Sequence, residues 1–256
     1  MKIRTYLSRV KRSLLKKPYS KDKQYPAYWF QEVVGNRKAQ IIQIGSNDGK
    51  TGDPLHELLH KNDNWKALFV EPVKYSFEKL KSNYADDSRF RFENVAINNG
   101  EKMNFYYVDP AAKNEFPDLP YWYDQLGSFN KEHIVNQLDG KLSNYILKME
   151  IEGLSLGSLI ERNDIVQLDI LHIDTEGYDW KILSQLDLEK FFPYFILMEY
   201  NHLTEAELRE TETFLSSNYT IFNVGIDLLA VNNVVDTAII DKMKKSMKLF
   251  SFDNIQ

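Results

Sequence analysis

The chain has 256 residues, of which 43% are hydrophobic and none is cysteine. This length suits one α/β domain with extensions, and the lack of cysteine excludes disulfides and thiolate metal sites and fits a reducing compartment. No stretch approaches the roughly 20 consecutive apolar residues that a transmembrane helix needs, and residues 1–17 lack the apolar core of a signal peptide, so we expect a soluble, cytoplasmic protein.

The N-terminal arm, residues 1–24, is strongly basic. It carries nine of the 32 basic residues and one of the 37 acidic residues, so residues 25–256 have a net charge of −13. An acidic domain argues against nucleic-acid binding. Apolar residues recur in the arm at helical spacing, at Ile3, Leu7, Val10 and Leu14. Such a helix either lies on the inner face of an anionic membrane through residues 1–17 or docks on the acidic domain of its own chain, and the second interpretation is slightly favoured.

The first strand and the loop after it dominate the pattern of the sequence. Residues 25–30 begin an aromatic helical segment that we expect to lie on the sheet. Residues 41–44, three isoleucines and Gln43, are typical of a buried parallel strand, and residues 45–52 form a loop with three glycines. A helix is predicted at residues 53–61, with Asp53 as its cap. A strand, a glycine loop and a helix N-terminus in this order let a nucleotide-like ligand approach the backbone closely.

The second predicted strand, residues 66–70, ends at Glu71. An acidic residue about 20 positions after such a loop lies where a bound ribose presents its hydroxyl groups. The alternative is that Glu71 only caps the next helix, residues 73–84. The loop has neither the G-x-x-x-x-G-K-[ST] pattern of a triphosphate site nor a complete G-x-G-x-x-G. Loop and carboxylate together favour an adenosine ligand.

The middle of the chain is less regular. We expect a third strand at residues 89–97 and, after a tight turn, an added antiparallel strand at residues 101–109. Residues 110–145 follow, with a short helix near residues 131–138. The aromatic segment 116–123 contains two prolines and four aromatic residues. It is either a lid or substrate wall, or a loop that anchors itself by burying its own rings.

The second half of the chain alternates strands and helices. Strands are predicted at residues 148–154, 168–173 and 195–198, helices at residues 155–162, 178–186, 204–217 and 236–248, and a hairpin at residues 219–224 and 228–231. No repeat or linker interrupts this order, so we interpret residues 25–256 as one domain. His172, inside the strand at 168–173, is typical of a hydrogen-bonded core histidine.

Polar residues gather where the predicted strands end. In an open, mostly parallel sheet, ligands bind beyond the carboxyl ends of the strands. This rule brings together residues 45–49, Glu71, residues 94–96, the pair Asp174 and Glu176, and the cluster of Glu199, Asn201 and His202. With the strands at 168–173 and 195–198 as neighbours, carboxylates from both face each other across one cleft.

These residues allow several kinds of chemistry. Asp174 and Glu199 could bind a divalent cation such as Mg²⁺, with Asn201 adding an oxygen. One carboxylate could instead have a raised pKa and act as a general base toward a substrate hydroxyl, and His202 is the other candidate base. The structural alternatives are a helix cap for Asp174 and a favourable first-turn charge for Glu176.

Several segments resemble those of a known family. Residues 43–54, QIGSNDGKTGDP, resemble motif I of the FkbM-type methyltransferases, which use S-adenosylmethionine. Residues 172–177, HIDTEG, resemble the strand-four motif of that family, an apolar strand followed by D-x-E-G. Residues 69–72 (FVEP) and 94–97 (NVAI) fall at matching positions between them. One departure is Gln43, where many methyltransferases carry an acid.

The resemblance covers residues 39–232 and implies a fold, a cofactor and site residues. The fold is α/β, a Rossmann-like methyltransferase sheet of seven strands, mostly parallel with a C-terminal antiparallel hairpin, and residues 25–256 form the methyltransferase domain. The implied S-adenosylmethionine-binding residues are Gln43, Gly45, Ser46, Asn47, Asp48, Gly49, Glu71, Pro72, Asn94, Val95, Ala96 and Asp174. Asp174, Glu176 and Glu199 would face the methyl group and the acceptor, with His202 as a candidate catalytic base.

The leading hypothesis is an S-adenosylmethionine-dependent O-methyltransferase that acts on a hydroxyl group of a sugar, polysaccharide or glycolipid-like acceptor. The basic arm and the aromatic segment suggest that acceptor. A second hypothesis is a non-catalytic adenosine-binding or membrane-associated scaffold. An NAD-dependent dehydrogenase is less favoured, because the Tyr-x-x-x-Lys pair of this chain, Tyr75 and Lys79, follows the second strand.

Overall fold

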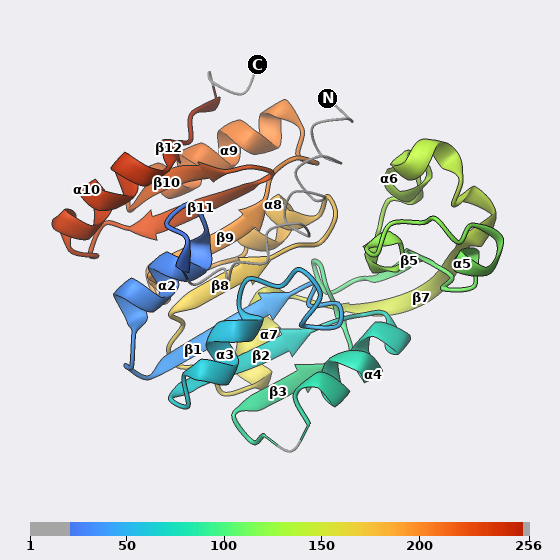
Figure 1. The fold of residues 1–256 in the computed structure, drawn as a ribbon, viewed down its shortest axis with the longest axis horizontal. Coiled ribbons are helices and arrows are strands. Elements are labelled where there is room, and N and C mark those ends of the chain that lie inside the picture. Colours follow the sequence, from blue (N-terminus) through green and yellow to red (C-terminus); the bar gives the residue numbers. More distant parts are fainter. Residues whose placement is uncertain (1–20, 86, 253–256) are drawn as a thin grey trace.

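The computed structural model describes residues 21–85 and 87–252. At its centre lies an eight-stranded sheet with the strand order β12-β10-β11-β9-β8-β1-β2-β3 (Figure 1). A parallel block is formed by β1 (Ala39–Ile44), β2 (Trp65–Val70), β3 (Phe90–Glu93), β8 (Ile170–Ile173) and β9 (Phe195–Glu199). The antiparallel strands are β10 (Tyr219–Val224), β11 (Asp227–Asn232) and β12 (Lys248–Leu249).

This sheet has the predicted α/β arrangement, with β8 between β1 and β9 and with β10 and β11 as a C-terminal hairpin. The predicted number of seven strands is wrong by one. β12 pairs with the edge strand β10, and the amide of Phe250 extends this contact by donating to the carbonyl of Ile221 at 2.9 Å. An edge strand presents unpaired backbone groups, and the returning chain after the last helix satisfies some of them.

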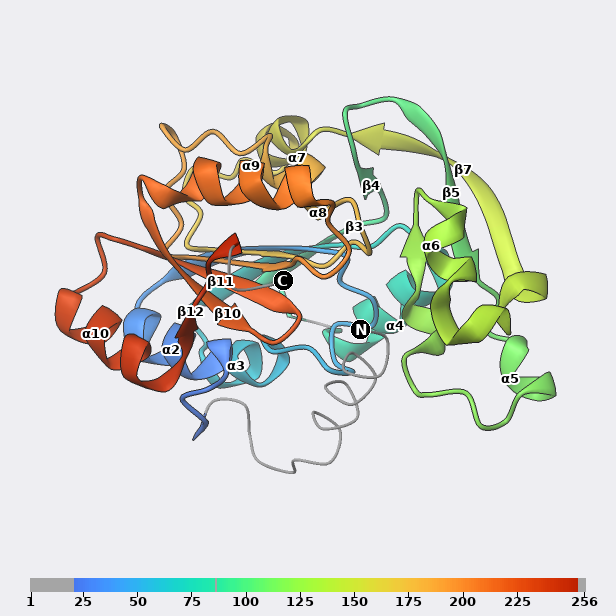
Figure 2. The ribbon, with the colours of Figure 1, turned by 90° about the horizontal axis from the view of Figure 1, so that it is seen from above.

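Helices cover both faces of the sheet (Figure 2). One face holds α2 (Pro26–Val34), α3 (His56–Lys61), α4 (Lys74–Asn83) and α10 (Thr237–Ser246), and the other holds α7 (Leu156–Arg162), α8 (Asp179–Leu183) and α9 (Glu205–Ser216). Because both faces are covered, the central strands are mostly apolar on both faces rather than alternating. Successive residues of β1 divide between the faces: Ile41 lies in one core and Ile42 in the other.

The predicted helices and strands of the parallel block agree with the structure to within a few residues. A capping box starts α9, with the Thr204 side chain accepting from the Glu207 amide and the Glu207 side chain accepting from the Thr204 amide. The helix predicted at residues 53–61 begins later, at His56. Asp53 does not cap it; its carboxylate accepts from the Leu55 amide at 2.7 Å and from the Gln43 side chain at 3.2 Å.

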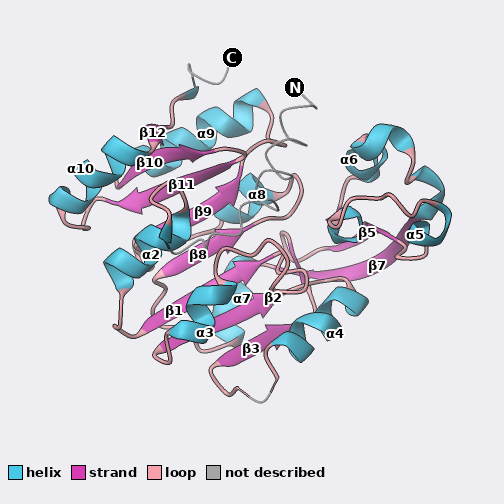
Figure 3. Ribbon diagram, in the orientation of Figure 1, coloured by secondary structure: helices cyan, strands magenta, loops and turns pink. Residues whose placement is uncertain are grey.

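A second sheet, with the order β4-β7-β5-β6, forms a lobe beside the carboxyl ends of the parallel strands (Figures 1 and 3). We define the lobe as residues 96–154. Its elements are β4 (Ala96–Ile97), β5 (Lys102–Val108), α5 (Ala112–Glu115), β6 (Gly127–Ser128), α6 (Lys131–Val135) and β7 (Ile146–Leu154). The lobe has a core of its own, in which the rings of Trp122 and Tyr123 are buried. The aromatic segment 116–123 therefore anchors itself, as one of the two interpretations expected.

The strand predicted at residues 89–97 is wrong as a single element. It divides into β3 and β4, which belong to different sheets. Asn94 lies at the division, where its side-chain amide donates to the carbonyls of Glu71 at 2.7 Å and Pro72 at 3.0 Å. These bonds hold the chain beside the end of β2 while its backbone leaves the main sheet for the lobe.

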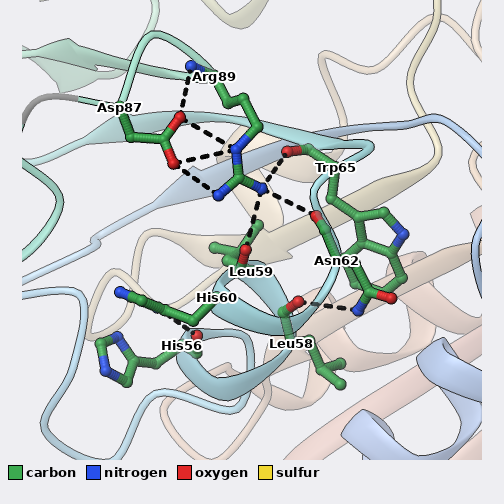
Figure 4. Close-up of polar contacts among 8 residues, drawn as sticks. All are labelled: His56, Leu58, Leu59, His60, Asn62, Trp65, Asp87 and Arg89. Atoms are coloured by element: carbon green, nitrogen blue, oxygen red, sulfur yellow. Dashed lines mark hydrogen bonds and ion pairs between the residues drawn. The ribbon is translucent and has the colours of Figure 1, made fainter.

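At the opposite, amino edge of the sheet, Arg89 fixes the turn between α3 and β2 (Figure 4). Its guanidinium donates to the carbonyls of Leu59 at 3.1 Å, Asn62 at 2.8 Å and Trp65 at 3.3 Å. The other side of the guanidinium binds Asp87 at 2.6 Å. An arginine can satisfy several carbonyl groups at once because it presents five donors in one plane, so this residue sets where β2 and β3 begin.

The interactions proposed for the basic arm lie outside the described residues, apart from residues 21–24. Among the helices of the described ranges, none combines the length and the apolar character that crossing a membrane requires.

Candidate active site

The glycine loop is fixed against the ends of β2 and β8. The amides of Gly45 and Ser46 both donate to the carbonyl of Val70 at 3.0 Å, and the Ser46 hydroxyl donates to the Gln43 carbonyl at 2.8 Å. Gly45 has φ +78°, and a Cβ there would lie 1.9 Å from the carbonyl oxygen of Asp174. A side chain at this position is excluded, because the backbones that end β1 and β8 touch here.

Glu71 organises the loop from the end of β2. One of its carboxylate oxygens accepts from the Asn47 amide and the other from the Val73 amide, both at 2.8 Å. Its side chain is buried, and burial raises the pKa of this carboxyl to about 7, with a further contribution from the charge of Asp174. Asn47 adopts φ +49°, a conformation that this hydrogen bond stabilises. Glu71 thus makes the contact to the start of α4 that the capping alternative expected, and it also faces the loop.

A cavity lies between the glycine loop, the end of β2 and the lobe. Seven of the candidate cofactor-binding residues line it: Gly45, Asn47, Glu71, Pro72, Val95, Ala96 and Asp174. Apolar side chains of Val73, Ile97 and Phe105 complete its wall. A buried carboxylate beside an apolar wall suits an adenosyl group, whose ribose offers hydroxyl donors and whose base offers an apolar face.

The remaining candidates lie around this cavity. Gln43 and Ser46 line a second cavity on the other side of Gly45. Asp48, Gly49 and Asn94 are not among the residues that line either cavity. The Asp48 carboxylate accepts from the Lys50 amide at 2.9 Å, and a Cβ at Gly49 would lie 2.4 Å from the Leu80 side chain. These residues shape the loop and its contact with α4.

The second cavity is more polar. It is lined by Gln43, Asp53, His172 and Asp227 among others. Gln43 Oε1 and His172 Nδ1 are buried without a hydrogen-bond partner among the described residues, so the interpretation of His172 as a satisfied core histidine is wrong. Burial raises the pKa of the Asp53 carboxyl, while the neighbouring His172 lowers it. Buried polar atoms without partners are rare and expensive, so this cavity is suited to a polar group of a ligand.

The D-x-E-G turn after β8 and the end of β9 bring three carboxylates close together. Oxygens of Asp174, Glu176 and Glu199 all lie within 4.8 Å of one another. Glu176 has φ +54°, which a residue with a side chain adopts only under constraint. The Ser128 hydroxyl of the lobe holds this turn by donating to the Glu176 carbonyl at 3.0 Å.

Asp179, the first residue of α8, holds the same turn through hydrogen bonds to its backbone. Its carboxylate accepts from the amides of Thr175 and Gly177, both at 3.1 Å. It is buried, and burial together with the charge of Asp174 raises the pKa of Asp179 to about 7. The sequence prediction missed this residue, although a carboxylate five positions after Asp174 at a helix N-terminus is a usable signal.

Two histidines complete the cluster. His133 of α6 places Nε2 2.7 Å from Glu176 Oε2. His202 places Nε2 3.3 Å from Glu176 Oε2 and 3.4 Å from Glu199 Oε1. The two rings are nearly perpendicular, with centroids 4.2 Å apart. His202 was predicted here, whereas His133 was missed because no local pattern marks it and only the fold of the lobe brings it to the sheet. Asn201 lies half-buried in the turn before His202, and its role as a metal ligand stays a prediction.

The pair Tyr75 and Lys79 lies away from this cluster. The Tyr75 hydroxyl donates to the carbonyl of Asp124, and Lys79 Nζ lies 3.4 Å from the Asp124 carboxylate. Both residues therefore tie α4 to the lobe, and neither lines the two cavities. This placement gives the dehydrogenase hypothesis no support.

Several solved structures are similar to this chain. Fibrillarin, a pre-rRNA processing protein of Methanococcus jannaschii, is 10% identical with a TM-score of 0.38, covering 77% of this chain and 66% of that one. A precorrin-6y C5,15-methyltransferase from Geobacter metallireducens is 10% identical with a TM-score of 0.40, covering 80% and 84%. A TehB-like SAM-dependent methyltransferase from Corynebacterium glutamicum is 10% identical with a TM-score of 0.37, covering 90% and 97%. No curated protein matches the sequence.

The family profile described as the methyltransferase FkbM domain matches residues 43–221. This match includes the glycine loop, Glu71, the D-x-E-G turn and the end of β9, and it confirms the resemblance found in the sequence. Because it spans more than half of the chain, the protein belongs to the FkbM methyltransferase family and is a SAM-dependent methyltransferase.

Proposed function

We propose that the protein transfers the methyl group of S-adenosylmethionine to a hydroxyl group of a sugar, polysaccharide or glycolipid-like acceptor. One observation carries this proposal: Asp174 and Glu176 line the same cavity as Glu71, and they also belong to the cluster of carboxylates and histidines. A cavity suited to an adenosyl group therefore shares a wall with groups that can bind a hydroxyl and accept its proton.

The residues around the two cavities fit the parts of the cofactor. Each Glu71 oxygen accepts one amide bond and keeps a lone pair for a ribose hydroxyl. Val95 and Ala96 offer an apolar surface to the base. The buried polar atoms of Gln43 and His172 lie on the other side of Gly45, where they suit the charged amino-acid end of the cofactor.

The cofactor, when bound, supplies an electrophilic methyl group on a sulfonium. The chain has two tasks: to align the acceptor oxygen and to take its proton. While the oxygen–carbon bond forms and the sulfur–carbon bond breaks, the hydroxyl proton would pass to one of the candidate bases Asp174, Glu176, Glu199 and His202. A general base that neighbouring carboxylates orient is suited to this step. Alignment of the reacting atoms can supply much of the rate enhancement.

The test is transfer of a labelled methyl group to a panel of glycans, glycolipids and small hydroxyl compounds, followed by mass spectrometry of the product. We expect a methyl ether on at least one hydroxyl acceptor and formation of S-adenosylhomocysteine. Methylation of a carbon or nitrogen atom instead would contradict the proposed O-methylation. Cofactor binding without transfer to any acceptor would favour a non-catalytic adenosine-binding protein.

We also propose that the enzyme works in the cytoplasm, with the arm available for contact with the inner face of the membrane. The absence of cysteine and the basic character of residues 1–24 support this placement. Cell fractionation of the full chain and of a chain without residues 1–20 tests it. Loss of a membrane-bound fraction on truncation is expected, and an unchanged distribution would contradict the role of the arm.

A further inference from the structure

Donor atoms from three separate elements converge beside the cavity. Nε2 of His133, Nε2 of His202 and a carboxylate oxygen of Glu176 lie within 4.8 Å of one another. His133 comes from α6 of the lobe, Glu176 from the turn after β8, and His202 from the turn after β9. Glu199 Oε1, at the end of β9, lies beside this set, 3.4 Å from His202 Nε2.

The separations of these atoms match those around a metal ion. With bonds of about 2.0–2.1 Å, neighbouring donors of a four-coordinate zinc ion lie about 3.3 Å apart. His202 Nε2 lies 3.3 Å from Glu176 Oε2 and 3.4 Å from Glu199 Oε1. The third separation, between His133 Nε2 and Glu176 Oε2, is 2.7 Å, so the short helix α6 needs to move outward by several tenths of an ångström.

The orientation of His202 points to the same ligand. Its Nε2 is buried and has no hydrogen-bond partner among the described residues, although two carboxylate oxygens lie within 3.4 Å. The ring therefore aims this nitrogen between the carboxylates without the geometry of a hydrogen bond to either. An imidazole nitrogen aimed at a point between carboxylate oxygens has the arrangement of a metal ligand.

Charge and support favour a cation as well. Glu176 and Glu199 are buried, with 7% and 2% of their surfaces exposed, and burying two carboxylates together is costly unless positive charge balances them. The turn that carries Glu176 is held by Ser128 at 3.0 Å. Asn130 caps α6, its side chain accepting from the Glu132 amide at 3.1 Å. Rigid support of this kind is what keeps metal ligands in place.

We propose that His133, Glu176 and His202 bind a divalent transition-metal ion of the zinc and manganese type. Two imidazole nitrogens with one carboxylate favour such an ion over Mg²⁺, which prefers oxygen donors. This set differs from the oxygen-only site of Asp174, Glu199 and Asn201 expected from the sequence. The ion joins the lobe to the main sheet, because His133 is the ligand that the lobe supplies.

The role of the ion rests on the proposed function, whereas its binding does not. Glu176 lines the cavity, so an acceptor hydroxyl entering there can become a further ligand. A divalent ion lowers the pKa of a bound hydroxyl group, and the released proton can pass to Asp174, whose carboxylate lies within 4.8 Å of those of Glu176 and Glu199.

The experiment uses the full chain, freed of metal with a chelator and then titrated with zinc chloride and with cobalt chloride. Calorimetry and elemental analysis measure the stoichiometry, and the visible absorption of bound Co²⁺ reports nitrogen and oxygen ligation. We expect one ion per chain, bound at least ~10-fold more weakly by His133→Ala and His202→Ala. His60→Ala is the matched control, because His60 is an exposed histidine of α3 and should bind the ion as the unchanged chain does.

Failure of the unchanged chain to bind either ion would overturn the proposal, and so would equal affinity in the His133 and His202 variants. If His202→Ala does not fold, His133→Gln provides the same comparison, because it changes the ligand that the lobe supplies. Calorimetry with S-adenosylmethionine on the same metal-free samples separates the two proposals. A chain that binds the ion but not the cofactor retains the metal site and loses the proposed function, and the reverse result removes the metal site alone.

Discussion

Gly45 is the residue at which the glycine loop meets the D-x-E-G turn. Its amide is bonded to β2, and its Cα lies so close to β8 that a Cβ would be 1.9 Å from the Asp174 carbonyl oxygen. Two effects act there, the positive φ of +78° and the steric contact. A positive φ alone costs roughly 1–2 kcal/mol for a residue with a side chain, whereas backbone atoms in contact cannot move aside without displacing a strand.

We therefore expect Gly45→Ala to lower the free energy of unfolding by more than ~3 kcal/mol. Gly100→Ala is the matched control, because Gly100 has φ +88° but open space around its Cα, so it isolates the cost of the backbone conformation. Urea unfolding of both variants measures the difference. Equal destabilisation in the two would show that the contact with Asp174 contributes nothing.

Glu71 and Asp179 give the stability a pH dependence. Burial raises the pKa of Glu71 from 4.5 to about 7 and that of Asp179 from 3.8 to about 7. Each group therefore binds its proton more tightly in the folded protein than in the unfolded chain, so its contribution to stability is present at low pH and is lost as the pH rises through about 7. The loss for Glu71 is of the order of 3 kcal/mol.

Unfolding by urea at a series of pH values from 4.5 to 8 tests this assignment for Glu71, whose pKa moves from 4.5 to about 7. The free energy of unfolding of Glu71→Gln should fall less steeply with pH than that of the unchanged chain. Glu78→Gln serves as the control, because Glu78 is exposed on α4. Identical slopes in all three proteins would contradict the raised pKa of Glu71.

At the scale of elements, the contact between α4 and the lobe is carried by Tyr75. Its hydroxyl donates to the carbonyl of Asp124, and its burial raises the pKa of this phenol. Lys79 reaches the same residue, but its side chain is 55% exposed, and an exposed ion pair contributes little to stability. Asp124 also lines the cavity, so this contact helps to set the position of the cavity wall.

Tyr75→Phe should loosen the lobe while leaving the main sheet unchanged. We expect amide hydrogen exchange to become about 10-fold faster across residues 96–154, in line with the loss of one buried hydrogen bond. Lys79→Ala, which removes the exposed partner only, should change exchange by less than ~3-fold. Faster exchange spread evenly over the parallel strands would mean that the lobe does not open as a separate unit.

The elements also show which parts of the fold the sequence specifies. Mostly apolar runs such as residues 41–44 predict buried parallel strands, because a strand covered on both faces carries apolar side chains on both. The split of residues 89–97 was missed, since it depends on the Asn94 side chain bonding to the end of β2. The two-residue strand β12 was missed as well, because so short a pairing depends on the edge of β10 and carries no periodicity of its own.

At the scale of the whole molecule, the candidate site is built from segments that are far apart in the chain. The carboxyl-edge rule brought Glu71, Asp174 and Glu199 together from the sequence, because parallel strands end at the same edge. The lobe adds what that rule omits. The second sheet carries the short helix that brings His133 to Glu176, 43 positions away in the sequence. No rule on strand ends predicts such a residue.

We expect the glycine loop, Glu71 and the D-x-E-G turn to enclose an adenosyl group at this edge of the sheet. Calorimetric titration of S-adenosylmethionine into the chain tests it most directly, with Glu71→Ala, Asp174→Asn and the exposed control Glu78→Ala compared at one pH. We expect Glu71→Ala to bind S-adenosylmethionine at least ~10-fold more weakly, which is the effect of losing one or two hydrogen bonds. Asp174→Asn should bind the cofactor with unchanged affinity but turn over more slowly, because Asp174 acts on the acceptor. Unchanged cofactor affinity in Glu71→Ala would contradict the account.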